Sequence, residues 1–290
     1  MELGEGRYGA GAVREILDRH GFKTSKSKGQ NFLTDANIPE KIVRLSTIDS
    51  SCGVLEIGPG LGALTLALSR AAGRVTAVEL DARLLPILRE TLSERDNVEI
   101  VQGDILKLDI SDLVKKNMPG MKHLACANLP YSITTPALSA LISAGVFDSI
   151  TVMVQREVAR RICAKPGSPD YGAFTVYANY HTEPEALFDV PPECFMPRPK
   201  VYSTVIVMKT RADRFLEADE EKMFFRVVRA AFGQRRKTLV NALHAAFGNA
   251  MGKNDILGIV IGCGFDVNVR GETLGIDEFI RLSQCFLTES

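Results

Sequence analysis

The sequence predicts an α/β fold, with a parallel sheet covered by helices, followed by a smaller all-helical domain. Between residues 53 and 155, short apolar runs rich in Val and Ile alternate with helical patterns at intervals of roughly 20–25 residues. Most of these runs are apolar on both faces, which is typical of strands buried in a parallel sheet. After about residue 212 the runs give way to amphipathic helical patterns separated by glycines. The alternation therefore predicts a doubly wound sheet, and the later segment a separate helical domain.

Five runs are expected to form successive strands: GVLEIG (53–58), RVTAVEL (74–80), VEIVQGD (98–104), HLACANLP (123–130) and SITVMVQ (149–155). A later run, VYSTVIVMKT (201–210), alternates in polarity and is expected to be an antiparallel strand at the end of the sheet. Helical patterns cover residues 61–72, 82–94, 217–234, 236–248 and 276–287. The chain is thus divided into an N-terminal helical segment (1–50), a sheet domain (51–211) and a helical domain (212–290).

Composition excludes several classes of protein. No apolar run approaches the roughly 18 residues that mark a membrane-spanning helix. The first residues lack the basic-then-apolar pattern of a signal peptide, so a cytoplasmic protein is expected. The six cysteines are scattered and none forms a CxxC pair, so neither a disulfide framework nor a metal site is expected. Nothing in the sequence demands more than a monomer.

The charge is balanced overall but uneven along the chain. There are 35 basic and 35 acidic residues, yet residues 7–30 carry six Lys or Arg against two acids, and residues 197–241 carry eleven against five. Such a distribution allows a nucleic-acid-binding face on a neutral protein. An ordinary solvated surface explains it equally well, so charge alone does not decide between the two.

The first strand runs into a glycine-rich turn, LEIGPGLGALT (55–65). Gly58 and Gly60 permit a tight turn and close approach of a ligand to the backbone, although a purely structural turn would use them too. Glu79 ends the second strand about 20 residues later, where nucleotide-binding folds place a carboxylate that accepts from ribose hydroxyls. Asp104 ends the third strand, where an acid can accept from an adenine amino group.

The spacing of these glycines argues against two common classes of nucleotide-binding site. GPGLG departs from the GxGxxG fingerprint of dinucleotide sites, and no phosphate-binding Lys follows it as in a P-loop. A nucleoside cofactor without a pyrophosphate fits better, and S-adenosyl-L-methionine is the obvious candidate. A dehydrogenase-like site remains the alternative at this point.

The fourth strand ends in ANLPYSITTP (127–136), beside the expected cofactor. The Asn128 side chain and the Leu129 carbonyl can both accept from an exocyclic NH2 group. Pro130 fixes the backbone, and Tyr131 offers a flat face on which a base can stack. The plainer interpretation is a proline turn with a capping Asn. An aromatic amine is a poor nucleophile, and two acceptors that hold its hydrogens would aim its lone pair at a methyl carbon.

Taken together, these motifs resemble the rRNA adenine N6,N6-dimethyltransferases, most closely the KsgA-type small-subunit branch. SKGQNFLTD (27–35) resembles the family's entrance motif, in which Asn31 and Leu33 touch the cofactor. EIGPGLGALT, VELD, GDIL and NLPYSITTP match in order and spacing. CFMPRPKVYSTV (194–205) is similar to its F-x-P-x-P-K-V-x-S segment, and FGQRRKTLVNAL (232–243) resembles its basic helix. The resemblance extends over nearly the whole chain.

The resemblance implies a Rossmann-like, seven-stranded class I methyltransferase sheet and a helical RNA-binding domain. It implies S-adenosylmethionine-dependent dimethylation of two adjacent adenosines near the 3′ end of small-subunit (16S) rRNA, within an assembling 30S-type particle. Phe195 would stack on the target base opposite Tyr131, or else be a buried anchor for its loop. The implied RNA-binding residues are Arg198, Lys200, Arg235, Arg236 and Lys237.

Two rival functions stay open. A large-subunit rRNA adenine dimethylase of the antibiotic-resistance type would share the cofactor site and the chemistry. A ribosome-assembly or transcription factor could use the same fold without catalysis. The presence of Glu79, Asp104 and Asn128 argues against loss of activity.

Overall fold

The computed structural model describes residues 9–24, 29–212 and 216–288. They form two compact units. The first contains the described residues up to Ala159 together with Glu185–Thr210, and the second contains Arg160–Pro184 together with the described residues after Thr210. The helical unit therefore includes a segment, residues 160–184, that the sequence suggested would belong to the sheet domain. Helix α8 (Ala173–His181) explains this grouping, because it packs against helix α9 (Ala218–Gly233).

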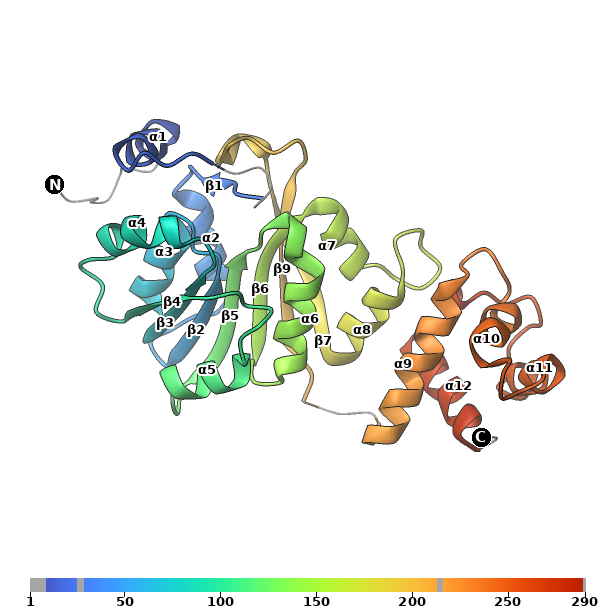
Figure 1. Cartoon of the computed structure of the whole chain (residues 1–290). Coiled ribbons are helices and arrows are strands. Elements are labelled where there is room, and N and C mark those ends of the chain that lie inside the picture. The colour runs from blue at the N-terminus through green and yellow to red at the C-terminus, as the bar shows by residue number, and fades with distance from the viewer. Residues whose placement is uncertain (1–8, 25–28, 213–215, 289–290) are drawn as a thin grey trace. The chain divides into compact units, whose positions relative to one another are not determined.

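The first unit is built on a seven-stranded sheet (Figure 1). Its strand order is β4-β3-β2-β5-β6-β9-β7. Neighbouring strands from β4 to β6 are parallel, and β9 runs antiparallel to β6. From β2 the chain adds β3 and β4 on one side of β2, and it then adds β5 and β6 on the opposite side. This reversal of strand order next to β2 is the kind of switch point at which open α/β sheets bind ligands. The strands are β2 (Cys52–Ile57), β3 (Arg74–Glu79), β4 (Val98–Gln102), β5 (Lys122–Asn128), β6 (Ser149–Gln155), β7 (Thr182–Val190) and β9 (Ser203–Thr210).

The antiparallel strand expected at residues 201–210 is present, but it does not lie at the edge of the sheet. The edge position belongs to β7, which the sequence analysis missed. Its sequence, TEPEALFDV, contains a proline and three acids, and all positions between its two buried end residues are exposed or half-buried. Proline and charge are compatible with an edge strand, where one side of the backbone lacks a neighbour, but they obscure the usual strand pattern.

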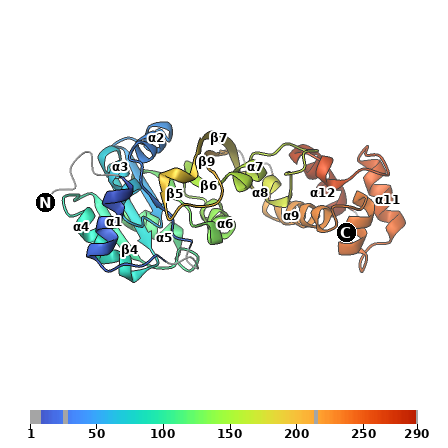
Figure 2. The same ribbon diagram turned by 90° about the horizontal axis from the view of Figure 1, so that it is seen from above.

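Helices cover both faces of the sheet (Figure 2). Val54 of β2 belongs to a buried cluster with residues of α2 (Asn37–Leu45) and α3 (Ala63–Ala71). A side chain at the neighbouring Gly53 would point to the opposite face, toward Met118, which follows α5 (Ile110–Asn117). Met118 lies so close that a Cβ atom at position 53 would come within 2.7 Å of it. Helix α6 (Thr134–Ala144) packs beside α5.

An N-terminal segment covers the glycine-rich turn. Helix α1 (Ala10–Arg19) contributes Val13, Ile16 and Leu17 to a buried cluster that contains Leu61 of that turn. Strand β1 (Phe32–Leu33) pairs antiparallel with β8 (Phe195–Met196), so that Leu33 lies opposite Phe195. This short ladder joins the expected entrance motif to the proline-rich segment at residues 195–203. Three basic residues of the N-terminal segment, Arg7, Lys26 and Lys28, lie outside the described residues.

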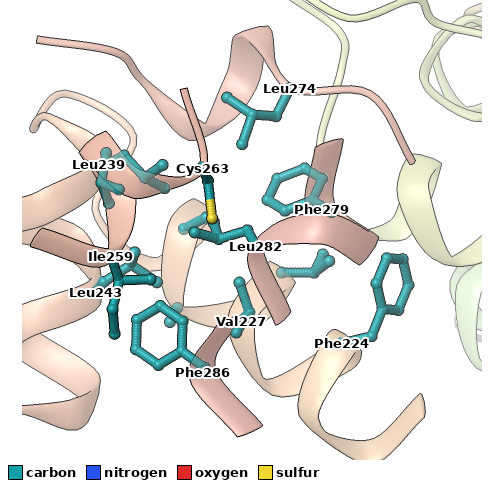
Figure 3. Close-up of a cluster of buried hydrophobic side chains, with 14 of the residues drawn as sticks. Phe224, Val227, Leu239, Leu243, Ile259, Cys263, Leu274, Phe279, Leu282 and Phe286 are labelled. Carbon is teal, nitrogen blue, oxygen red and sulfur yellow. The ribbon is translucent and has the colours of Figure 1, made fainter. Parts of the chain in front are cut away.

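The second unit is helical and has its own core. Alongside α8 and α9 it contains α10 (Leu239–Phe247), α11 (Lys253–Gly262) and α12 (Ile276–Thr288). Phe224 of α9 and Phe279 and Phe286 of α12 are fully buried in this core (Figure 3). The glycine-rich stretch after residue 248 thus contains an ordered helix, α11, with Ile256 and Val260 in the same core. Across the parts of the chain that the structure describes, no helix combines the length and apolarity needed to cross a membrane.

Candidate active site

A cavity of about 290 Å³ opens at the carboxyl ends of β2, β3 and β5, with the segment after β4 completing this side. Small-molecule sites in proteins typically measure roughly 300–1,000 Å³, so the cavity suits a compact ligand. Residues 29–33 of the N-terminal segment line its remaining side. The sequence-predicted residues that it brings together are Asn31, Leu33, Gly58, Gly60, Glu79, Asp104, Asn128, Leu129, Pro130 and Tyr131.

The glycine-rich turn lets the backbone approach the cavity closely. Gly58 and Gly60 have φ angles of 66° and 61°, a left-handed conformation that other residues rarely adopt. A Cβ atom at position 60 would also come within 3.1 Å of the Phe32 ring. The turn therefore requires glycine at position 60 both for its backbone conformation and for its packing.

Glu79 is buried at the carboxyl end of β3 and is oriented by the backbone. The Asp81 N–H donates to one carboxylate oxygen at 2.7 Å, and the Gly60 N–H donates to the other at 3.3 Å. Burial raises the pKa of Glu79, and these backbone hydrogen bonds counter part of that rise. Each oxygen has further lone pairs, so the carboxylate can also accept a pair of hydroxyl groups from a ligand.

Asp104 lies at the adjacent position along this edge of the sheet. The Leu106 N–H donates to Asp104 Oδ1 at 3.1 Å, and Lys107 Nζ lies 3.9 Å from Oδ2. The carboxyl group is half-buried and lines the cavity. It offers an acceptor to an amino group on the ring end of a nucleoside ligand.

Asn128 ends β5, where its amide is oriented by the N-terminal segment. Its Nδ2 atom donates to the Asn31 carbonyl at 3.4 Å. Because the amide nitrogen makes this contact, the amide oxygen of this cavity residue is left to act as an acceptor. The Leu129 N–H donates to the Met153 carbonyl at 3.2 Å, which anchors the same turn to β6. Tyr131 is half-buried next to them, and its hydroxyl lies 2.8 Å from Ser203 Oγ.

The entrance motif closes the cavity from the other side. Asn31 and Leu33 both line it, and the contact with the cofactor that the resemblance implies stays a prediction. Gln30 Nε2 donates to Asp81 Oδ2 at 3.0 Å, and Arg83 binds the same carboxylate. These contacts fasten the N-terminal segment to the end of β3, directly after Glu79.

Glu56 is a cavity residue that the sequence analysis missed. It is 1% exposed within β2, and its Oε2 atom has no hydrogen-bond partner among the residues that the structure describes. Burial, together with the charge of Glu79, raises the pKa of Glu56 to about 8. The signal in the sequence that could have identified Glu56 is an acid inside an otherwise apolar strand. A buried carboxyl with an unused oxygen in the cavity fits a ligand that has a cationic group, because the cation would favour the ionised form.

The raised pKa of Glu56 makes the free energy of unfolding depend on pH. The usual pKa is 4.5 and the folded value is about 8, so the unfolded state binds fewer protons between these values and stability falls as pH rises through them. Glu56→Gln stays neutral and removes this slope. From pH 5 to pH 7 the free energy of unfolding of the wild type should fall by on the order of 3 kcal/mol relative to that of Glu56→Gln.

Urea unfolding of the cofactor-free protein at both pH values measures this difference. Glu94→Gln is the matched control, because Glu94 is exposed after α4 (Leu85–Thr91). An identical pH slope in wild type and Glu56→Gln would contradict the assignment.

Phe195 does not line the cavity with the other predicted residues. It is 4% exposed and belongs to a buried cluster with Leu33 and Val190. This position corresponds to the buried-anchor alternative, and stacking on a base would require the ring to leave the cluster. Arg198 and Lys200 are exposed in the segment that follows, where Arg198 forms an ion pair with Glu193.

The basic residues of the helical unit lie in a turn and not on a helix as expected. Arg235, Arg236 and Lys237 fall between the end of α9 and the start of α10 at Leu239. Arg235 donates to the carbonyls of Pro169 and Tyr171 at 3.0 and 2.9 Å, and also contacts Glu272. Arg235, although exposed, therefore makes contacts within the helical unit, and Arg236 and Lys237 are exposed beside it. Within the described ranges, no group of three or more His, Cys, Asp or Glu side chains could hold a metal ion.

Comparisons with known proteins agree on one family. The sequence model of "Ribosomal RNA adenine dimethylase" matches residues 21–261. The "Ribosomal RNA small subunit methyltransferase A" of Geobacillus kaustophilus (strain HTA426) is 46% identical over 276 residues, covering 94% of each chain.

Two solved structures share most of the fold. A dimethyladenosine transferase from Plasmodium falciparum is similar with a TM-score of 0.75 and 25% identity, covering 89% of this chain and 98% of that one. The 23S rRNA methyltransferase ErmE has a TM-score of 0.68 and 26% identity, covering 88% and 98%. With the family match covering most of its length, the chain belongs to the ribosomal RNA adenine dimethylase family.

Proposed function

We propose that this protein transfers methyl groups from S-adenosylmethionine to the amino nitrogens of two adjacent adenosines in small-subunit rRNA. The observation that carries the proposal is the placement of Asn128 in one cavity with Glu79 and Asp104. Side chains suited to a nucleoside cofactor thus share one cavity with an acceptor suited to an exocyclic amine, which supports the proposal. The high identity to a protein named for the small subunit supports the choice of substrate.

The cavity residues suit the parts of the cofactor. Glu79 would accept from the ribose hydroxyls and Asp104 from the adenine amino group. Glu56 would lie toward the cationic methionine end, and Asn31 and Leu33 would cover the ligand. The bound cofactor supplies an electrophilic methyl group on a sulfonium.

The acceptor amine would be held by two oxygens. The Asn128 amide oxygen and the Leu129 carbonyl would accept its two hydrogens, which favours a pyramidal nitrogen with its lone pair aimed at the methyl group. Pro130 fixes this turn, with φ of −57° and ψ of 129°. No general base is needed for attack, because the nitrogen becomes acidic only after it has been methylated and would then release its proton to solvent.

The RNA would be held mainly through its backbone. The target adenine must leave its stack to enter the cavity, where Tyr131 offers a face for it. Arg236 and Lys237 are the exposed candidates for phosphate contacts, with Arg198 and Lys200 as further candidates. We infer a cytoplasmic enzyme that works as a monomer on an assembling small-subunit particle.

Labelled methyl transfer to separated ribosomal subunits tests the proposal. Undermethylated small subunits should accept label, and large subunits should not. A large-subunit enzyme is the second candidate, since the likeness to ErmE extends over 88% of this chain. Label confined to large subunits would establish that alternative. Cofactor binding without methylation of either particle would favour a non-catalytic assembly factor.

Arg236→Ala should weaken RNA binding and reduce its salt dependence. Each lost phosphate contact lowers the slope of log affinity against log salt by about 0.7–0.9. Affinity measured over a range of salt concentrations gives this slope. Lys253→Ala is the charge-matched control, because Lys253 is exposed at the start of α11. An equal loss of slope in that control would mean that overall charge, and not a contact, is responsible.

Arg235→Ala provides the contrasting case. Because Arg235 contacts two carbonyls and Glu272, its loss should lower the melting temperature of the protein.

A further inference from the structure

The Tyr131 hydroxyl has a specific partner on a distant strand. Its oxygen lies 2.8 Å from Ser203 Oγ, a contact between residues 72 positions apart. Ser203 is 0% exposed and begins β9, directly opposite Gln155 of β6. A fully buried hydroxyl normally has a hydrogen-bond partner, and this one is the tyrosine of the acceptor motif.

Other contacts fix the backbone of this motif but not the plane of the ring. The Leu129 N–H is bound to Met153, and Thr134 Oγ1 donates to the Pro130 carbonyl at 3.2 Å. The Pro130 ring lies against Gly58, at 3.7 Å from the position a Cβ would occupy there. The Tyr131 side chain still has two rotatable bonds. A hydrogen bond at the far end of the ring restricts both.

We propose that Ser203 is a positioning residue, whose hydroxyl orients the Tyr131 ring so that it presents its face to the target base. The inference rests on the proposed function, because it gives Tyr131 the stacking role. Burial raises the pKa of Tyr131 above its usual value of 10, so the phenol is neutral at neutral pH and either hydroxyl can donate in this hydrogen bond.

The position of Ser203 also gives a role to the segment at residues 195–203. Phe195 pairs with Leu33 of the entrance motif at one end, and Ser203 holds Tyr131 at the other. One segment thus connects the cofactor side of the cavity with the acceptor side. These two contacts account for the buried aromatic residue and the buried hydroxyl of the segment.

The adjacent residue supplies a matched control. Thr204 is also buried in β9, but its Oγ1 donates to Asp189 Oδ1 at 2.6 Å, away from the acceptor motif. Thr204→Val removes one buried hydroxyl from the same strand. General loosening of β9 would affect both variants, whereas loss of ring orientation would affect only Ser203→Ala.

The test is a double-mutant cycle in kcat for methyl transfer to undermethylated small subunits. Ser203→Ala should lower kcat by about tenfold, as expected for one hydrogen bond used in orientation, with cofactor and RNA affinities within about twofold of wild type. Thr204→Val should leave kcat unchanged. In a Tyr131→Phe background, Ser203→Ala should have no further effect.

Two results would overturn the inference: wild-type kcat in Ser203→Ala, or an undiminished Ser203→Ala effect in the Tyr131→Phe background. A wild-type protein that methylates neither ribosomal subunit would instead refute the proposed function.

Discussion

Replacing Asn128 with alanine is expected to lower the rate of methyl transfer by roughly 100- to 1,000-fold, the usual cost of losing one preorganised polar group at a reacting centre. The amide oxygen is one of two acceptors for the target amine, and its loss leaves the lone pair poorly aimed. RNA affinity should change little, because binding relies on phosphate contacts away from the cavity. Single-turnover rates and RNA binding measured on the same preparation separate the two quantities.

Two further variants make the Asn128 experiment specific. Asn128→Asp keeps an acceptor oxygen at the same place and should retain more activity than Asn128→Ala. Asn249→Ala removes an exposed amide after α10 and should leave the rate unchanged. A normal rate in Asn128→Ala would exclude Asn128 from the chemistry.

Replacing Glu79 with alanine should raise the dissociation constant for S-adenosylmethionine by about 100-fold or more. A carboxylate that accepts from a pair of ribose hydroxyls makes two charge-assisted hydrogen bonds, each contributing about 1.5–3 kcal/mol. The carboxylate also receives the Gly60 and Asp81 N–H groups, so its loss additionally loosens the glycine-rich turn. Calorimetric titration with the cofactor measures the change.

A control distinguishes loss of ribose contacts from loss of the turn. Glu99 is a half-exposed acid on β4 that pairs with Arg74 at 3.1 Å, so Glu99→Ala removes an acid of the same sheet without touching the cavity. It should bind cofactor normally. Unaltered cofactor affinity in Glu79→Ala would contradict the assignment of the ribose site to the end of β3.

The sequence was sufficient to predict most strands of the sheet and the polar residues at the strand ends that line the cavity. Strands buried on both faces leave continuous apolar runs, and polar residues at their carboxyl ends stand out against them. Glu79, Asp104 and Asn128 were predicted in this way, and the structure brings them to one cavity. Their positions follow from strand order, because parallel strands end on the same edge of the sheet.

Other features depend on tertiary contacts that local patterns do not encode. Strand β7 has an edge environment that tolerates Pro184 and its acids, so it lacks the usual alternation. Glu56 is flanked by apolar residues in the sequence, and only the tertiary structure shows that it lines the cavity together with Glu79. The basic turn was read as helix because its pattern continues into α10. Thr238 has an extended backbone, with φ of −63° and ψ of 156°, so the helix begins only at Leu239.

The role of Phe195 was ambiguous in the sequence because an aromatic residue in a proline-rich segment suits both a base-stacking surface and a buried anchor. The structure places the ring in a core cluster beside Leu33. Its proposed contact with the target base stays a prediction, whereas Tyr131 already lines the cavity.

The most direct test of the central claim is nucleoside mass spectrometry of rRNA from undermethylated small subunits after incubation with this protein and S-adenosylmethionine. We expect N6,N6-dimethyladenosine at two adjacent positions near the 3′ end, absent when Asn128→Ala replaces the wild type under the same conditions. Methylation at another atom, or dimethyladenosine only in large-subunit rRNA, would contradict the account.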